Sequence, residues 1–273
     1  MGPSEAGRWD GTRRIDGMMS DRAERDTAVA PKRRRVSFIT IIGELLITAG
    51  VLVFLFLGWQ LWLNDLIVGA SQNRAGASLG QGWEVVSPSH PHASPVPVAS
   101  FGPPVVEVAP HHTTKFAVMY VPRFGATYAR SISQGVETTT VLDKNGIGHY
   151  PGTQMPGQVG NFAVAAHRTT HGAPFKPLAT LQVGDRIYVQ TQDGYYTYEF
   201  RGLEYVRPTG VGVLDPVPQL PGVTPTDRIL TMTSCNPMFT AEERIIAYAS
   251  LESWRPTSAG PPAQISATVA AKS

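Results

Sequence analysis

The apolar segment from Val36 to Leu57 is the feature that most constrains how this chain folds. It contains almost no polar residues, and roughly 20 such residues cross a bilayer as a helix. A basic cluster precedes the segment, and Trp59 and Trp62 follow it, where an interfacial aromatic belt would fall. The positive-inside rule therefore predicts a cytoplasmic disordered tail (1–35), a transmembrane anchor (36–63) and an extracytoplasmic remainder. A cleavable signal peptide is the alternative, but the apolar segment is long for one and a polar tail precedes it.

The composition of the chain favours a loop-rich β fold. The 273 residues include 27 glycines and 23 prolines, whereas charged residues make up only 16%. Such a composition is typical of short strands joined by turns rather than of a helical bundle. The net charge is only +2, and basic residues cluster only beside the apolar segment. This distribution argues against a nucleic-acid partner.

Short strand-like runs place one folded domain at residues 115–254. Turn signals such as Pro151-Gly152 and Asp193-Gly194 separate the runs. Regular short strands of this kind predict a mainly β fold, a closed or nearly closed barrel with only short helical turns, for example around Pro174–Leu181. The runs are Phe116–Val121, Asn161–Ala166, Asp185–Gln190, Tyr195–Val206, Arg228–Ser234 and Arg244–Leu251.

Both flanks of this domain are predicted to lack a core of their own. Residues 64–114 read as a helical extension of the anchor followed by an extended Pro/Ser/His-rich linker. Residues 255–273 are polar and contain prolines, which predicts a disordered tail. The histidines near the linker have no cysteine or carboxylate arrangement beside them, so we interpret them as solvated rather than metal-binding. They are His90, His92, His111 and His112.

The chain has one cysteine, Cys235, at the end of an alternating β-branched run that Asn-Pro then terminates. Outside the cytosol this thiol has no partner for an intrachain disulfide, and a free thiol there is a liability unless it is used. A thiol at the rim of a sheet is accessible to a substrate. Cys235 is therefore a candidate nucleophile, and the alternative is a buried cysteine that acts as a small apolar residue.

A cysteine nucleophile needs a proton partner and a group that stabilises an oxyanion. His167 ends its strand-like run as Cys235 does, so two neighbouring strand ends would place both side chains together. Arg244 begins the run that follows Cys235 after a short connection, which predicts neighbouring strands; a salt bridge with a nearby glutamate is the alternative. His149 and His171 lie in turn contexts, and we interpret them as turn-stabilising or surface residues.

These residues and their surroundings resemble the sortase family, and most closely the class E sortases of high-GC Gram-positive bacteria. The resemblance covers residues 116–254, and class E members carry their histidine in a similar His-Arg-Thr-Thr context. Where the family usually has Thr-Leu-x-Thr-Cys, this chain has Met232 in place of the leucine and Ser234 in place of the second threonine, which keep the apolar and hydroxyl character. The motifs are Gly148-His-Tyr-Pro-Gly-Thr153, Ala166-His167-Arg168-Thr-Thr170, Thr231-Met-Thr-Ser-Cys235-Asn-Pro237 and Arg244.

The resemblance implies a membrane-anchored cysteine transpeptidase on an eight-stranded β-barrel. Its substrate would be a secreted protein with a C-terminal Leu-Ala-x-Thr-Gly or Leu-Pro-x-Thr-Gly sorting signal, cleaved between Thr and Gly through a thioacyl intermediate. The acceptor would be an amine of a lipid-linked peptidoglycan precursor. Cys235 would be the nucleophile, His167 would protonate the leaving amine, and Arg244 would hold the substrate and stabilise the oxyanion.

Two further expectations concern binding residues. Ser234 is a candidate substrate contact beside the nucleophile, with strand hydrogen bonding as the alternative. Some sortases need calcium at an acidic loop site, but residues 205–227 offer only Asp215 and Asp227 as acidic candidates for one. No metal or other cofactor is therefore expected.

Three other functions compete with this interpretation. A pilin-polymerising sortase would use a lysine side chain as acceptor, but no lid-like Asp-Pro-aromatic motif lies between residues 84 and 115. An inactive membrane-tethered binding module would not require all three candidate catalytic residues, Cys235, His167 and Arg244. A papain-like hydrolase is disfavoured because the cysteine ends a strand instead of opening a helix.

Overall fold

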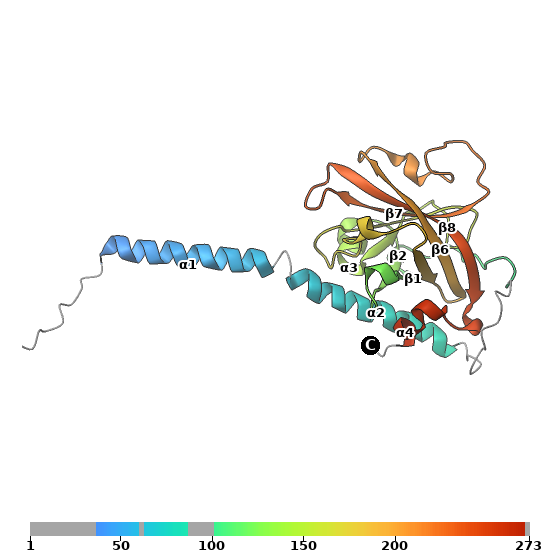
Figure 1. The fold of residues 1–273 in the computed structure, drawn as a ribbon, viewed down its shortest axis with the longest axis horizontal. Coiled ribbons are helices and arrows are strands. Elements are labelled where there is room, and N and C mark those ends of the chain that lie inside the picture. The colour runs from blue at the N-terminus through green and yellow to red at the C-terminus, as the bar shows by residue number, and fades with distance from the viewer. Residues whose placement is uncertain (1–36, 60–62, 87–100, 271–273) are drawn as a thin grey trace, which may run out of the picture. The chain divides into compact units, whose positions relative to one another are not determined.

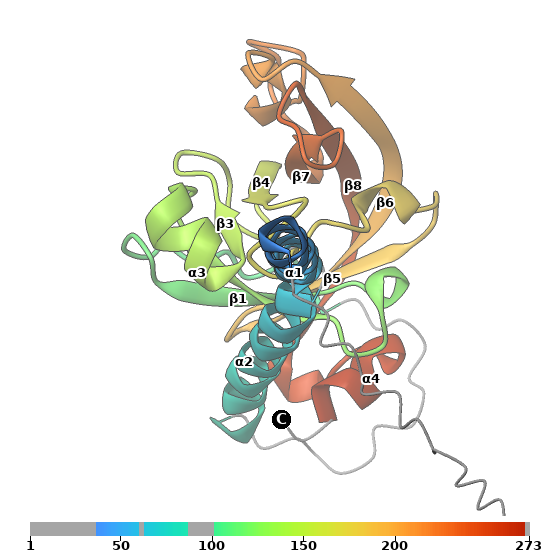
Figure 2. The same ribbon diagram turned by 90° about the vertical axis from the view of Figure 1, so that its left-hand side faces the viewer.

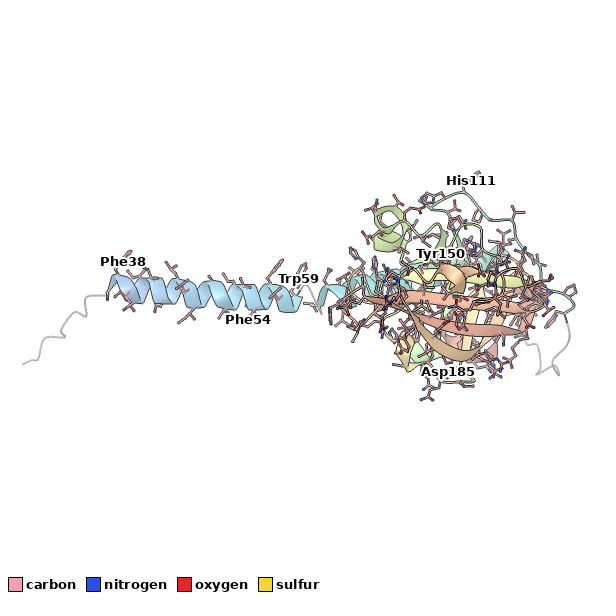
Figure 3. The ribbon with its side chains drawn as sticks, turned by 90° about the horizontal axis from the view of Figure 1, so that it is seen from above. Phe38, Phe54, Trp59, His111, Tyr150 and Asp185 are labelled. Carbon is pink, nitrogen blue, oxygen red and sulfur yellow. The ribbon has the colours of Figure 1, made fainter. Side chains whose placement is uncertain are left out.

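The computed structural model describes residues 37–59, 63–86 and 101–270. The predicted cytoplasmic tail and much of the predicted linker lie outside these ranges. Within them, α1 (Phe38–Gly58) is the one helix long and apolar enough to span a membrane. Figure 3 shows apolar side chains, Phe38 and Phe54 among them, projecting around this helix. The length and composition of α1 match the predicted anchor.

Eight strands close into a barrel in the order β1-β2-β3-β4-β7-β8-β6-β5, which confirms the expected architecture (Figure 1). Most neighbouring strands are antiparallel, but β2 pairs in parallel with β3, and β4 pairs in parallel with β7. The strands are β1 (Lys115–Tyr120), β2 (Ala129–Gln134), β3 (Ile147–His149), β4 (Gly160–Ala166), β5 (Arg186–Gln190), β6 (Gly194–Val206), β7 (Arg228–Asn236) and β8 (Glu243–Pro256).

Helices in the described part of the barrel domain are short, as the turn-rich sequence predicts. A turn of 3-10 helix occurs inside the stretch that was expected to be helical, Pro174–Leu181. The elements are η2 (Pro122–Phe124), η3 (Thr138–Leu142), α3 (Asp143–Asn145), η4 (Leu178–Thr180), η5 (Val211–Leu214), η6 (Thr257–Ala259) and α4 (Ala263–Ala270).

Side chains along β4 and β7 point alternately into the barrel and away from it. Those that point inward fill the barrel interior, and the others lie on the outer face. Phe162 and Val164 of β4 and Leu230 and Met232 of β7 belong to the main apolar core. Because successive side chains of a strand point to opposite faces, the residues between them face outward. Cys235 therefore belongs to the outer set, and methionine at position 232 keeps the apolar core role.

A glycine-lined face lets helix α2 (Asn64–Val86) lie directly against the outside of β1 and β2 (Figures 1 and 2). Gly69, Gly76 and Gly80 are buried on this face. A methyl group at Gly76 would lie 2.3 Å from the carbonyl oxygen of Ala129, and contacts that short do not occur in real proteins. The close approach of α2 to the barrel therefore depends on the missing side chains.

The C-terminal segment differs from the disordered tail predicted to begin at residue 255. Strand β8 continues to Pro256, and α4 packs against α2 and the outer face of β1. Ile265 and Val269 are only 1% and 4% exposed. They lie four residues apart, so they form one apolar helix face, and burying that face offsets the ordering of an otherwise polar segment.

His149 lies inside the domain rather than at its surface. Its side chain on β3 is fully buried; Nδ1 lies 2.7 Å from Gln134 Oε1, and Nε2 lies 3.0 Å from the Gln154 carbonyl oxygen. Thr153 Oγ1 is also 3.0 Å from Nε2, so the His149 ring stabilises the turn that follows β3. Burial lowers the pKa of His149 to about 4.

This burial predicts an acid-sensitive fold. The unfolded chain binds a proton at His149 near pH ~6.5, whereas the folded chain binds it only near pH 4, so stability falls as the pH drops through this window. The loss at the lower limit is on the order of 3 kcal/mol. Urea unfolding of the full chain in detergent at pH 7.5, 6 and 4.5 measures it. His149→Gln should lose less stability over the same range, and identical pH dependence of both proteins would contradict the prediction.

Two glycines of α2 make a matched pair for testing its packing. Gly76→Ala should lower stability by roughly 1–3 kcal/mol, because the new methyl group forces α2 away from β2. Gly82→Ala is the control: an added Cβ meets nothing within 4 Å there, so stability should rise by roughly 0.5–1 kcal/mol. Thermal unfolding of the full chain distinguishes the two. A shift of the same sign for both variants would show that the packing of α2 is not the cause.

Candidate active site

The parallel pairing of β4 with β7 brings His167 and Cys235 to one edge of the sheet. In this register Ala165 lies opposite Thr233. His167 directly follows β4, and the same offset places it level with Cys235. The prediction that two neighbouring strand ends carry these residues is therefore confirmed at the level of the backbone.

Arg244 lies directly opposite Cys235 in the antiparallel β7–β8 ladder, as the short connection predicts. Side chains opposite each other in such a ladder share a face. The Arg244 guanidinium donates from Nη1 to the carbonyl oxygens of Ala241 (3.0 Å) and Glu243 (2.9 Å). Its partners are thus two backbone carbonyl oxygens, one in the connection before β8 and one at the first residue of β8, rather than a glutamate carboxylate.

Cys235 itself is a free, partly exposed thiol, which distinguishes it from a buried structural cysteine. Arg168 adds a second cation beside it: its Nη1 lies 3.5 Å from the Cys235 carbonyl oxygen and 3.4 Å from Asn236 Oδ1. Burial lowers the pKa of the Arg168 guanidinium. Sequence analysis did not assign a role to Arg168, although its place directly after His167 in the His-Arg-Thr-Thr motif was the available signal.

The His167 imidazole is paired with a carboxylate that the sequence analysis missed. Its Nε2 lies 2.8 Å from Oδ1 of Asp143 on α3, and both side chains are partly buried. Among the described residues this carboxylate, not the Cys235 thiol, is the hydrogen-bond partner of the ring. Asp143 precedes His167 by 24 positions on a separate element, so no local pattern connects the two.

His171 also belongs to this cluster, although it was expected to have only a turn or surface role. Its ring centroid lies 5.0 Å from that of His167, and its Nδ1 lies 3.6 Å from Asp143 Oδ1. The side chain is exposed at one edge, with 45% of its surface accessible. The loop after β4 therefore directs a second imidazole toward Asp143.

Helix α2 fixes the conformation of this loop. Asp65 accepts hydrogen bonds from the backbone N–H groups of Thr170 (3.1 Å) and Gly172 (3.3 Å), and Gln72 Nε2 donates to the His171 carbonyl oxygen (3.0 Å). Thr170 and His171 have φ values of 62° and 50°, a left-handed region that residues with a Cβ rarely adopt. The contacts from α2 offset this backbone strain.

Ser234 fits the alternative interpretation, strand hydrogen bonding, rather than a substrate contact. It is buried, and its Oγ donates to the Ala166 carbonyl oxygen at 2.7 Å. The reason is the alternation of the strand, because the residue before Cys235 points to the opposite face. The hydroxyl therefore joins β7 to β4.

Three hydrogen bonds organise the outer face of β4 and β7. Tyr150 Oη lies 2.9 Å from Thr233 Oγ1, and Figure 3 shows where Tyr150 lies on the barrel. Asn161 Nδ2 donates to the Val213 carbonyl oxygen of η5 (2.9 Å), while Thr231 donates to Asn161 Oδ1 (2.6 Å). The loop between β6 and β7 is thus tied to the same outer face that carries Cys235.

A cavity of about 490 Å³ lies away from this cluster, on the outer side of β6, β7 and β8. Ile229, Tyr248 and Glu204 line it. Ile229 is at the start of β7, whereas Cys235 is near its end, so the cavity does not coincide with the candidate catalytic residues.

Comparisons with known proteins agree on one family. The family model for the sortase domain matches residues 119–252. SrtE1 of Streptomyces coelicolor is 36% identical over 227 residues, which is 81% of this chain, and the chain spans 59% of SrtE1's length. The structure of SrtA sortase from Actinomyces oris has a TM-score of 0.57 at 34% identity, over 60% of this chain and 94% of that one. The structure of sortase E from Streptomyces avermitilis has a TM-score of 0.51 at 41% identity. This match covers 57% of this chain and 99% of the S. avermitilis chain.

The chain belongs to the sortase family. Its homologues include class E members, and sortases as a family are cysteine transpeptidases. The resemblance inferred from the sequence motifs is therefore confirmed. The papain-like alternative is wrong, because the domain is a closed sortase barrel.

The position of Arg168 predicts how fast the thiol of this sortase reacts. Arg168→Gln should change the rate of alkylation of Cys235 by iodoacetamide severalfold at pH 7, because the Arg168 side chain contacts the Cys235 carbonyl oxygen and Asn236 and so helps to position the thiol. The chain has one cysteine, so the mass of the labelled protein reports this site alone. Arg74→Gln, at an exposed position of α2, is the control and should react as the unmodified chain does. Equal rates for all three proteins would remove Arg168 from the thiol's environment.

Proposed function

We propose that this sortase is a membrane-anchored transpeptidase of class E type acting on C-terminal sorting signals. It cleaves Leu-Ala-x-Thr-Gly or Leu-Pro-x-Thr-Gly between Thr and Gly and joins the threonine to an amine of a lipid-linked peptidoglycan precursor. The observation that carries this proposal is the shared register of three residues: His167 is level with Cys235, and Arg244 lies directly opposite Cys235. The similarity to enzymes named sortase E supports the class.

The first half of the reaction uses the Cys235 thiol together with His167 and Arg244. The Cys235 thiolate attacks the threonine carbonyl carbon, and the carbonyl oxygen becomes an oxyanion that the Arg244 guanidinium stabilises. His167 then protonates the glycine nitrogen as the C–N bond breaks, which leaves a thioacyl enzyme. In the second half an incoming amine attacks the thioester, His167 accepts its proton, and the thiolate leaves.

Asp143 determines which nitrogen of His167 takes part in this proton transfer. An ionised carboxylate only accepts hydrogen bonds, so Nε2 of a ring 2.8 Å from Asp143 carries a proton. Nδ1 is then the nitrogen that exchanges protons with the substrate. Asp143 acts through His167 and is a positioning residue.

The apolar helix α1 and the charges that flank it in the sequence support the proposed membrane topology. The basic cluster before α1 lies on the cytoplasmic side, so the barrel lies outside the cell membrane. Exported substrate, enzyme and lipid-linked acceptor then meet at one membrane surface. The exported sorting-signal protein, the precursor amine and the membrane itself are the partners, and neither a nucleic acid nor a cofactor is required.

Peptide cleavage by the full chain in nanodiscs tests this function. Fluorogenic Leu-Ala-x-Thr-Gly and Leu-Pro-x-Thr-Gly peptides should be cleaved and, with an added amine, joined to it; Cys235→Ala should abolish both products. His167→Ala and Arg244→Ala should each lower the rate by roughly 10²–10³-fold, which is typical of a lost general acid or oxyanion donor. His111→Ala, at an exposed position before β1, is the control and should leave the rate unchanged.

The alternatives give different results in this assay. Cleavage that survives Cys235→Ala would contradict the thioacyl mechanism. A folded chain that binds the peptides without cleavage or a thioacyl adduct would be an inactive binding module. Transfer only to lysine side chains of a protein acceptor would identify a pilin-polymerising enzyme.

A further inference from the structure

Asp143, His167 and His171 gather three metal-ligand atoms beside the candidate active site. The three atoms lie within 4.8 Å of one another. Oδ1 of Asp143 is 2.8 Å from His167 Nε2 and 3.6 Å from His171 Nδ1. Two imidazoles and one carboxylate are a ligand set that zinc and neighbouring transition metals prefer, whereas calcium and magnesium prefer oxygen atoms alone.

Two of the three spacings are close to those of a tetrahedral zinc site, and the third, between the two histidine nitrogens, is within 4.8 Å. Bond lengths of roughly 2.0–2.2 Å separate ligand atoms by about 3.3–3.6 Å in that geometry. The His171–Asp143 distance already matches this spacing, and the His167–Asp143 pair needs to widen by only a fraction of an ångström. The side chains are partly accessible, so a water molecule has room to complete the coordination.

The protein holds His171 in place for this role at a cost in backbone strain. Its left-handed conformation is fixed by the Asp65 and Gln72 contacts from α2, and Gly172 is fixed by the Arg130 guanidinium, whose Nη2 donates to the Gly172 carbonyl oxygen at 3.2 Å. An ordinary surface histidine needs no such support. Strain that surrounding contacts maintain is typical of functional positions.

We propose that Asp143, His167 and His171 bind a divalent cation of the zinc class, and that this cation reversibly inhibits the enzyme. A metal on Nε2 of His167 displaces the proton through which this nitrogen is hydrogen-bonded to Asp143, and that proton passes to solvent or to Nδ1 of the same ring. With the metal on Nε2 and a proton on Nδ1, the ring has no lone pair left to accept a proton from the incoming amine. The inhibition rests on the proposed function, whereas metal binding does not.

Metal binding is tested by calorimetry on the full chain in detergent, purified through a tag without histidine. We expect one Zn²⁺ per chain, and Co²⁺ should give the visible absorption of a tetrahedral site. His171→Asn is the main variant, because asparagine tolerates the left-handed backbone but lacks the imidazole. It should weaken Zn²⁺ binding by roughly tenfold or more. Asp143→Asn should do the same independently, and Ca²⁺ or Mg²⁺ should not bind.

Two controls test the thiol and the exposed histidines before β1 as alternative donors. Cys235→Ala should bind Zn²⁺ as the unmodified chain does, and so should a variant with His111→Ala and His112→Ala. Zn²⁺ binding lost in Cys235→Ala would place the metal on the thiol and overturn the proposal. Unchanged binding in both His171→Asn and Asp143→Asn would overturn it as well.

Inhibition is measured by peptide cleavage with and without Zn²⁺. We expect Zn²⁺ to inhibit the unmodified chain and a chelator to restore the rate. For His171→Asn the readout is the ratio of its own rates with and without Zn²⁺, which should be close to one whatever its metal-free rate. Equal inhibition of both proteins would contradict the regulatory part. If no peptide is cleaved at all, the calorimetry still decides the metal site, so failure of the proposed function is distinguishable from failure of this inference.

Discussion

The geometry of the site depends on one constraint, the parallel pairing of β4 with β7. Only this pairing brings the ends of two strands, and with them His167 and Cys235, to the same edge of the barrel. The antiparallel β7–β8 ladder then places Arg244 across from Cys235. A register shift by one residue would move Cys235 to the inner face, so the core residues that fix the register, such as Met232, also fix the chemistry.

Helix α2 extends this constraint from the anchor region to the catalytic loop. Its glycine face allows backbone-to-backbone contact with β2, and the same face presents Asp65 to the loop after His167. Because a bulkier α2 would stand away from the barrel, the Asp65 contacts and the strained conformation of His171 depend on the glycines of α2. The geometry of the site therefore depends on how α2 packs against the barrel.

The backbone of the site was predictable from sequence, whereas its hydrogen bonds were not. Alternation and chain connectivity place Cys235 and Arg244, because strand pairing after a short connection leaves few options. The partners of His167 and His171 come from α3 and α2, and no periodic pattern links elements so distant. The order of α4 was missed for a different reason: two apolar residues in a polar segment form a face only when α2 and β1 are present to cover it.

In this conformation His167 and Arg244 are bonded to groups of the protein rather than to Cys235. His167 is paired with Asp143, and Arg244 with two backbone carbonyl oxygens. Hydrogen bonds of this exposed kind contribute about 0.5–1.5 kcal/mol each, so a bound substrate carbonyl competes for the Arg244 guanidinium at small cost. Each ~1.4 kcal/mol of such rearrangement lowers a rate tenfold. In the proposed mechanism, the contacts that hold His167 and Arg244 without substrate therefore also slow turnover, and the proposed metal would add to this effect by holding His167 in place.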